Sequence, residues 1–205
     1  MTDVHAWVTK VESGAPDIVA AWRGIEEGRF ISVRREVRRR SGEGTAARTV
    51  EQLAATAACL RDVVVALPEP AFAMPGGEGE WNVAEAVGHV AASRSGLVLA
   101  ASLAAADRWP QDAPAVVPGI PGPPRADREA LVRRIDQSQR VIERAGHRVE
   151  GHELDPCPLE HPLVGRLRCG EWLLFAGVHD LMHLAQLHGI AASFRPDSRV
   201  GGGLG

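Results

Sequence analysis

The sequence predicts an all-α protein built as a helical bundle, and three observations support this fold class. Apolar residues recur at helical spacing in four long blocks, whereas no segment of useful length alternates between apolar and polar residues. Residue pairs typical of helix starts precede several blocks. Segments rich in proline and glycine separate the blocks, so we expect four main helices joined by long loops.

The composition is that of one globular domain. The 205 residues are 45% hydrophobic and 24% charged, which suffices for a sizeable core without disulfides. The net charge of -3 argues against a nucleic-acid-binding surface across the chain. The three cysteines lack metal-type spacing, no N-terminal stretch resembles a signal peptide, and no run approaches the roughly 18 apolar residues of a membrane span. We therefore expect a cytoplasmic protein with free thiols and with neither nucleic-acid nor membrane partners.

Residues 1–45 are predicted to form an N-terminal helical extension. Within them, residues 17–40 fit one helix or two, because apolar side chains such as Ile18 and Trp22 recur at helical spacing. The segment ends in a basic cluster, which we interpret as a solvated helix end rather than as a contact for an anionic partner. The cluster consists of Arg34, Arg35, Arg38, Arg39 and Arg40.

The helical bundle itself is predicted over residues 46–192. Thr49 with Gln52 fits a capping box that starts a first helix ending near Leu67. Asn82 with Glu85 fits a second such start, for a helix that continues to about Asp107.

The second half of the bundle follows a loop that contains six prolines between residues 109 and 124. Asp127 is expected to cap the third helix, and residues 146–167 are expected to be a long loop. The fourth helix then ends near Gly189, and residues 193–205 form a tail that we expect to be flexible.

The fourth helix carries the most informative motif, His179 and His183, within a segment that is apolar nearly all round. Such a helix belongs in a core, where an imidazole without a hydrogen-bond partner costs roughly 1–3 kcal/mol. Side chains four residues apart share one helix face. A shared metal ion is therefore the simplest explanation for the pair.

A third ligand is predicted at His89 in the second helix, whose neighbours Val87 and Val90 point to the same interior. Three neutral imidazoles suit zinc, nickel, iron(II) or copper and leave a coordination position for water or substrate. Two alternatives stay open at this point. In the first, the ion has a structural role only. In the second, the histidines are hydrogen-bonded core residues and no metal binds.

Asp180 raises a rival interpretation. His-Asp-x-x-His is similar to the metalloprotease motif His-Glu-x-x-His, in which the acid acts as general base on a zinc-bound water. Asp180 is one methylene shorter than glutamate, and no third ligand follows at the protease spacing. The protease interpretation is therefore the weaker one.

Two stretches of the chain resemble the DinB-like metal-binding superfamily, which includes the YfiT-type proteins. The first, residues 79–90, reads GEWNVAEAVGHV, similar to the family's Trp-then-His opening of its second helix. The second begins with HPLVGRL at residues 161–167, continues with Glu171-Trp172, and ends in His179, His183 and Gln186. The resemblance spans roughly residues 46–190. It implies a four-helix bundle with a divalent metal held by His89, His179 and His183, and a homodimer is plausible because family members are often dimers.

The resemblance also suggests a function. Some relatives use the metal to activate a low-molecular-weight thiol, including mycothiol and bacillithiol, for transfer, conjugation or isomerisation. We therefore expect a metal-dependent enzyme of thiol transfer or small-molecule detoxification, in which Gln186 or His161 assists, with zinc, nickel or iron as the metal. A metal-bound hydroxide for hydrolysis is the alternative chemistry. The competing class is a non-catalytic metal-binding or stress-response protein.

Four further residues have structural and functional interpretations. Cys169 lies at the start of the last helix, where the helix dipole can lower a thiol pKa, but a small structural residue is the simpler interpretation. Cys157 is interpreted as a loop residue. Trp81 and Trp172 are expected to be core anchors.

Overall fold

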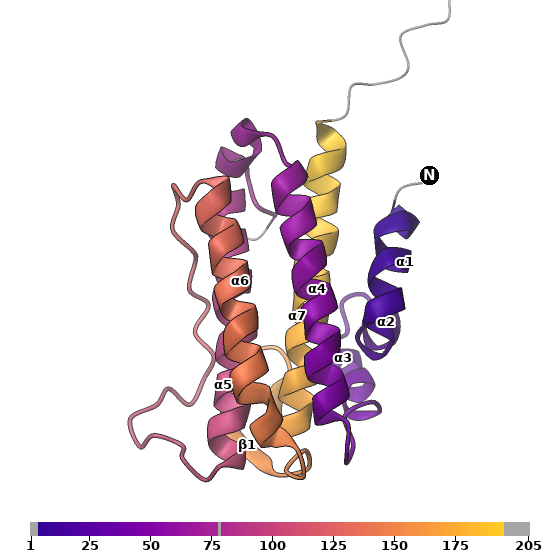
Figure 1. Cartoon of the computed structure of the whole chain (residues 1–205), viewed down its shortest axis with the longest axis vertical. Helices are drawn as coiled ribbons and strands as arrows, with labels where there is room; N and C mark the ends of the chain where they lie inside the picture. The colour runs from indigo at the N-terminus through magenta and orange to yellow at the C-terminus, as the bar shows by residue number, and fades with distance from the viewer. Residues whose placement is uncertain (1–3, 78, 195–205) are drawn as a thin grey trace, which may run out of the picture.

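In the computed structural model, the protein is an all-α bundle of four long helices (Figure 1). The structure describes residues 4–77 and 79–194. The C-terminal helix packs against two of the others, and the third long helix packs against the same two from the opposite side. The predicted fold class is therefore confirmed. The four helices are α4 (Ala46–Ala66), α5 (Val83–Ala105), α6 (Arg128–Ala145) and α7 (Cys169–Ser193).

Two of the three predicted caps are present. Asn82 and Glu85 form a reciprocal capping box at the start of α5, with both side chain to backbone bonds at 2.9 Å. Asp127 accepts a bond of 2.7 Å from the Ala130 amide at the start of α6. These short polar side chains satisfy amides that the first helical turn leaves unpaired.

The predicted capping box of Thr49 and Gln52 is wrong, because α4 already begins at Ala46. The Gln52 side chain instead accepts bonds from the amides of Asp17 and Ile18, at 2.9 and 3.2 Å. It therefore caps the start of a different helix. Residue spacing alone does not reveal this contact, since it joins segments 35 positions apart.

The N-terminal segment contains three short helices that pack against the long helices α4 and α7. Residues 17–40 are therefore divided between two helices. Ile18 lies so close to Gly177 that any side chain at 177 would collide with it. The division of the chain at residue 45 stays a prediction, and residues 195–205 of the predicted tail lie outside the described residues. The three helices are α1 (Val4–Gly14), α2 (Pro16–Arg23) and α3 (Phe30–Arg38).

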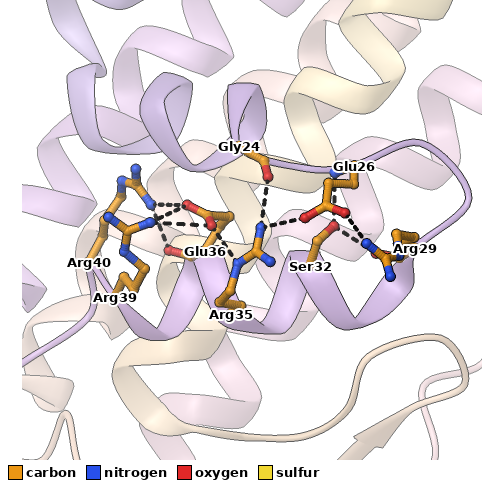
Figure 2. Close-up of polar contacts among 8 residues, drawn as sticks. All are labelled: Gly24, Glu26, Arg29, Ser32, Arg35, Glu36, Arg39 and Arg40. Atoms are coloured by element: carbon orange, nitrogen blue, oxygen red, sulfur yellow. Dashed lines mark hydrogen bonds and ion pairs between the residues drawn. The ribbon is translucent and has the colours of Figure 1, made fainter.

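Three of the five arginines of the basic cluster, Arg35, Arg39 and Arg40, form an ion-pair network around the buried carboxylate of Glu36 (Figure 2). Arg35 and Arg40 donate to this carboxylate at 2.8 and 2.7 Å. Hydrogen bonds from Arg40 and Arg35 lower the pKa of Glu36 to about 2. Arg38 points elsewhere and donates at 2.8 Å to buried Glu171 in the first turn of α7. The cluster is thus only partly a solvated helix end, because two buried carboxylates fix its orientation.

A short β-hairpin replaces the long loop expected over residues 146–167. Its strands are β1 (Pro156–His161) and β2 (Gly165–Arg168), which pair antiparallel. Apolar Cys157 and Leu159 point inward at alternate positions, but the prolines around them disguise this alternation. Gly165 has a positive φ of 69°, which suits the tight turn. Two 3₁₀ turns, η1 (Glu69–Ala73) and η2 (Gly146–Val149), complete the described elements.

Helix α5 is the one helix among the described residues that is long and apolar enough to cross a membrane by length and composition. Its most apolar window is 61% buried inside the protein, and the helix packs against α6 and α7. It is therefore a core helix of the bundle, and its apolar surface is explained by these contacts.

Candidate metal centre

The centre begins with His179 and His183, one turn apart on the face of α7 that meets α5. Their Nε2 atoms are 3.3 Å apart. Two imidazole nitrogens that each lie about 2.0–2.1 Å from one tetrahedral ion are about 3.3–3.4 Å from each other. The spacing of this pair therefore fits a shared metal ion.

His89 of α5 completes the group, as predicted. Its ring centroid lies 5.4 Å from that of His179 and 5.6 Å from that of His183. One ring nitrogen from each of the three histidines lies within 4.8 Å of the other two. The imidazole Nδ1 of His89 lies 2.9 Å from the carbonyl oxygen of Ile120. A carbonyl only accepts, so Nδ1 carries the proton, and the lone pair is left on Nε2 for a metal.

Two glycines bring the Ile120 carbonyl to His89. A Cβ atom at Gly122 would lie 2.5 Å from the Cα of Gly88, so both positions need glycine for the loop to touch α5. The Gly122 amide also donates at 2.9 Å to the carbonyl of Glu85. The loop is therefore anchored to the helix beside His89, and this contact orients the imidazole.

The environment keeps the two α7 histidines neutral. Burial, with smaller contributions from the neighbouring histidines, lowers the pKa of His179 well below its usual range. Burial and the proximity of His89 lower the pKa of His183 to about 4. At pH 7 both rings are therefore uncharged, which is the form that ligates a metal.

The three histidines lie on the wall of a cavity of about 280 Å³. Among the residues that the structure describes, no aspartate, glutamate, lysine or arginine lines it. Trp81 was expected in the core, but it is half-buried and lines the cavity with its ring 4.9 Å from that of His89. Trp172 is fully buried, as predicted. The centre is thus open on one side to an uncharged space large enough for a small molecule.

A sequence profile of the DinB superfamily matches residues 52–187. The chain belongs to the DinB superfamily. No curated protein and no solved structure matches the chain significantly. The matched range contains all three histidines, the whole of α5 and α6, and all but the first six residues of α4 and the last six of α7. The family assignment inferred from the Trp-His and His-x-x-x-His stretches is therefore confirmed.

His161 of this DinB protein lines the same cavity, at the end of β1. Its Nδ1 accepts a hydrogen bond of 3.2 Å from the Leu163 amide, and its ring packs edge-on against Phe175 at 5.1 Å. Burial, and to a lesser extent His89, lowers the pKa of His161. The residue therefore combines a turn contact with a position in the cavity, and its neutral form carries the proton on Nε2.

Gln186 was expected to assist at the metal, and Glu85 lies one turn before His89 on α5. Gln186 lines the cavity and forms a side-chain hydrogen bond with His183, so it lies beside a ligand. The carboxylate of Glu85 is engaged by the Asn82 amide in the helix cap. Ser93 was missed, although it lies four residues after His89 on the same helix face. Its hydroxyl is 3.3 Å from Nε2 of His89.

The geometry contradicts the metalloprotease interpretation of Asp180. This side chain is fully buried and accepts hydrogen bonds from Arg94 at 2.9 Å and from Thr56 at 2.6 Å. It is absent from the residues that line the cavity. A carboxylate held this way cannot act as general base on a molecule in the cavity.

The cysteines have no activated thiol. All three are free and buried. Burial raises the pKa of Cys169 to about 12, despite its position at the start of α7. Burial also raises the pKa of Cys157, which lies in β1 rather than in a loop. At neutral pH these thiols stay protonated, which favours the structural interpretation of Cys169.

Proposed function

We propose that the chain binds one divalent metal ion through His89, His179 and His183 and uses it as an enzyme acting on a small molecule. The reaction class is transfer or conjugation of a low-molecular-weight thiol, of the kind used in detoxification. Zinc, nickel and iron(II) all suit three imidazoles. When bound, such an ion lowers the pKa of a coordinated thiol or water and so makes a nucleophile available at neutral pH.

One observation favours a catalytic role of the ion over a purely structural role. In the part of the chain that the structure describes, the candidate ligand group holds three histidines and no fourth protein donor, and it faces the cavity of about 280 Å³. Structural zinc sites are normally enclosed by four protein ligands, whereas catalytic sites keep one position for water or substrate. The arrangement therefore favours catalysis over the alternative of a non-catalytic metal-binding or stress-response protein.

The cavity's own side chains favour an anionic nucleophile such as a thiolate. No carboxylate of residues 4–77 and 79–194 lines the cavity, so none of these side chains would repel a negative charge. Because Nδ1 of His161 is occupied by the Leu163 amide, the neutral ring has its proton on Nε2 and acts as a donor rather than as a base. Gln186 contacts His183 at the same wall. We propose that His161 and Gln186 orient the nucleophile, while the apolar residues around them exclude water.

The thiol proposal is tested with cobalt(II)-loaded protein titrated with 2-mercaptoethanol. A thiolate-to-cobalt charge-transfer band is expected in the near ultraviolet. In His161→Ala the apparent thiol affinity should fall about tenfold or more, since a hydrogen bond to a charged group is lost. The exposed His147→Ala is the matched control and should leave the affinity unchanged. Cobalt that stays bound without any band would overturn the thiol part and leave hydrolysis.

We further propose that the protein is a cytoplasmic homodimer. We propose that it binds a small-molecule substrate, and neither a nucleic acid nor a membrane. The three free, buried thiols support a reducing compartment. The dimer rests on the family resemblance alone. Light scattering of the purified chain tests it, with a mass of twice 21.9 kDa as the expected result.

A further inference from the structure

A second cavity, of about 290 Å³, lies between α5 and the proline-rich loop that follows it. We call this cavity, lined by Ala92, Gly96, Leu103, Pro110, Pro114 and Pro118 among others, the apolar annex. It adjoins the metal-site cavity, because one group of residues lines both. The shared residues are His89, Ser93, Leu97, Val117 and Pro118.

The annex is built from uncharged side chains. His89 is the one titratable residue in its lining among those the structure describes, and it lies at the end shared with the metal-site cavity. The three prolines of the outer wall have no amide N–H, so this wall offers few donors to water or to a polar ligand. The chemistry of the lining therefore favours an uncharged, apolar group.

The outer wall is fixed before any ligand arrives. Val117 donates to the carbonyl of Glu160 in β1 at 2.8 Å, and the Glu160 amide donates to Ala115 at the same distance. The contact between Gly122 and Glu85 anchors the loop again beyond the annex. The part of the wall from Ala115 to Gly122 is therefore held at two points and needs little ordering when a ligand binds, which favours affinity.

We propose that the apolar annex binds the uncharged apolar body of a small-molecule ligand whose polar head lies at the three histidines. This inference rests on the proposed metal function and names its substrate class. Seven residues separate His89 from Gly96 on α5, a distance of roughly 10 Å at 1.5 Å per residue. An alkyl or aryl group several carbons long therefore spans the distance from the metal site to Gly96, and the annex continues beyond Gly96 to Leu103.

Gly96 provides a specific way to close the annex. A Cβ atom added there would have nothing within 4 Å, so Gly96→Leu fills open space without a backbone collision. Leucine also has a higher helix propensity than glycine, which protects the fold. Gly189 of α7 is the matched control, because it is also helical, exposed and free of neighbours within 4 Å, but it lines neither cavity.

The test measures the affinity of zinc-loaded protein for straight-chain hydroxamic acids from acetohydroxamate to octanohydroxamate, whose head group chelates metals. Affinity should rise about fourfold for each methylene buried in the annex. In Gly96→Leu this rise should disappear, while the affinity for acetohydroxamate stays within twofold of the wild type. Gly189→Leu should behave as the wild type does.

The outcomes separate this inference from the function on which it rests. Failure of acetohydroxamate to bind would count against the metal site and would overturn both proposals. Binding of acetohydroxamate with no gain from longer chains, or an undiminished gain in Gly96→Leu, would overturn the annex alone. If Gly96→Leu instead dissociated a dimer and left the chain-length gain intact, the annex would be a subunit contact and not a ligand site.

Discussion

His179 and Asp180 are neighbours in α7, yet their side chains end in two buried polar clusters of opposite character. Asp180 faces the bundle interior, where Arg94 binds it and also donates to Ser138 at 2.9 Å and to the Leu53 carbonyl at 2.7 Å. This cluster draws on all four long helices and compensates its own charges. His179 faces the cavity, where the other ring nitrogens are its main polar neighbours.

The difference shows that α7 contributes one residue to a cluster that stabilises the fold and its neighbour to a cluster that can bind a metal. Arg94 and Asp180 are both fully buried, and the protein itself supplies the opposite charge. His179 and His183 are uncharged at neutral pH, Nε2 of His89 is free of the Ile120 bond, and the cavity leaves room beside the three rings. We therefore expect the first cluster to control folding and the second to control metal binding, with little effect of one on the other.

The largest expected effect is on stability, in Asp180→Ala. This change leaves the Arg94 guanidinium buried without its counter-ion and should lower the free energy of unfolding by about 3–5 kcal/mol. Urea unfolding measures the loss. Replacing both partners, as Arg94→Met with Asp180→Leu, should recover most of it. If Asp180→Ala abolished metal binding and left stability unchanged, the separation of the two clusters would be wrong.

His179→Ala should have the reverse effect, with metal binding lost and the stability of the metal-free protein nearly unchanged. The metal-free variant should unfold close to the metal-free wild type, because the ring lies beside an existing cavity. Zinc at 100 times its dissociation constant should stabilise the wild type by about 2.7 kcal/mol and should not stabilise the variant. Thermal unfolding with and without zinc measures both. Equal stabilisation of the two proteins would place the ion elsewhere.

A smaller effect is expected from the loop that orients His89. In Gly122→Ala the new methyl group collides with Gly88, so the Ile120 carbonyl should move away from the imidazole. Loss of such a supporting bond typically weakens metal affinity 10–100-fold. Competition with a chromogenic chelator measures it. Gly119→Ala, in the same loop but with nothing within 4 Å, is the control and should bind metal normally.

The smallest effect is expected at Glu36, which binds Arg35, Arg39 and Arg40 and belongs to neither of the two clusters (Figure 2). Its pKa falls from 4.5 to about 2 in the folded protein. A lowered pKa means that the carboxylate stabilises the fold above pH 4.5 and that this contribution disappears as the pH falls towards 2. Since most of the paired arginines are exposed, Glu36→Gln should cost about 1 kcal/mol at pH 7.

Thermal unfolding from pH 7 to pH 2 checks the Glu36 prediction. The difference in melting temperature between the wild type and Glu36→Gln should be constant down to about pH 4.5, the ordinary pKa of a glutamate, and should then close. A difference that does not depend on pH would mean that the variant acts through packing and not through charge.

The parts of the centre predicted from the sequence depend on local spacing. His179 and His183 share a face because they are one turn apart, and His89 follows a capping box whose register fixes its direction. Ser93 lies at the same spacing from His89 and was within reach of this reasoning. The family profile covers these same segments.

The parts that were missed depend on contacts between distant segments. Gln52 caps α2, the Ile120 carbonyl orients His89, and Phe30 of α3 lines the cavity. Nothing in the local sequence pairs these residues. The hairpin was missed for a different reason, since prolines around Cys157 argue against a strand although an edge strand tolerates them.

The most direct test of the central claim is elemental analysis of protein purified without a histidine tag, alongside His179→Ala and His183→Ala. We expect close to one zinc, nickel or iron per wild-type chain and almost none in either variant, with all three proteins folded. Wild-type protein that is folded, metal-free and unable to take up added zinc or nickel would contradict the account, and the three histidines would then be core residues without an ion.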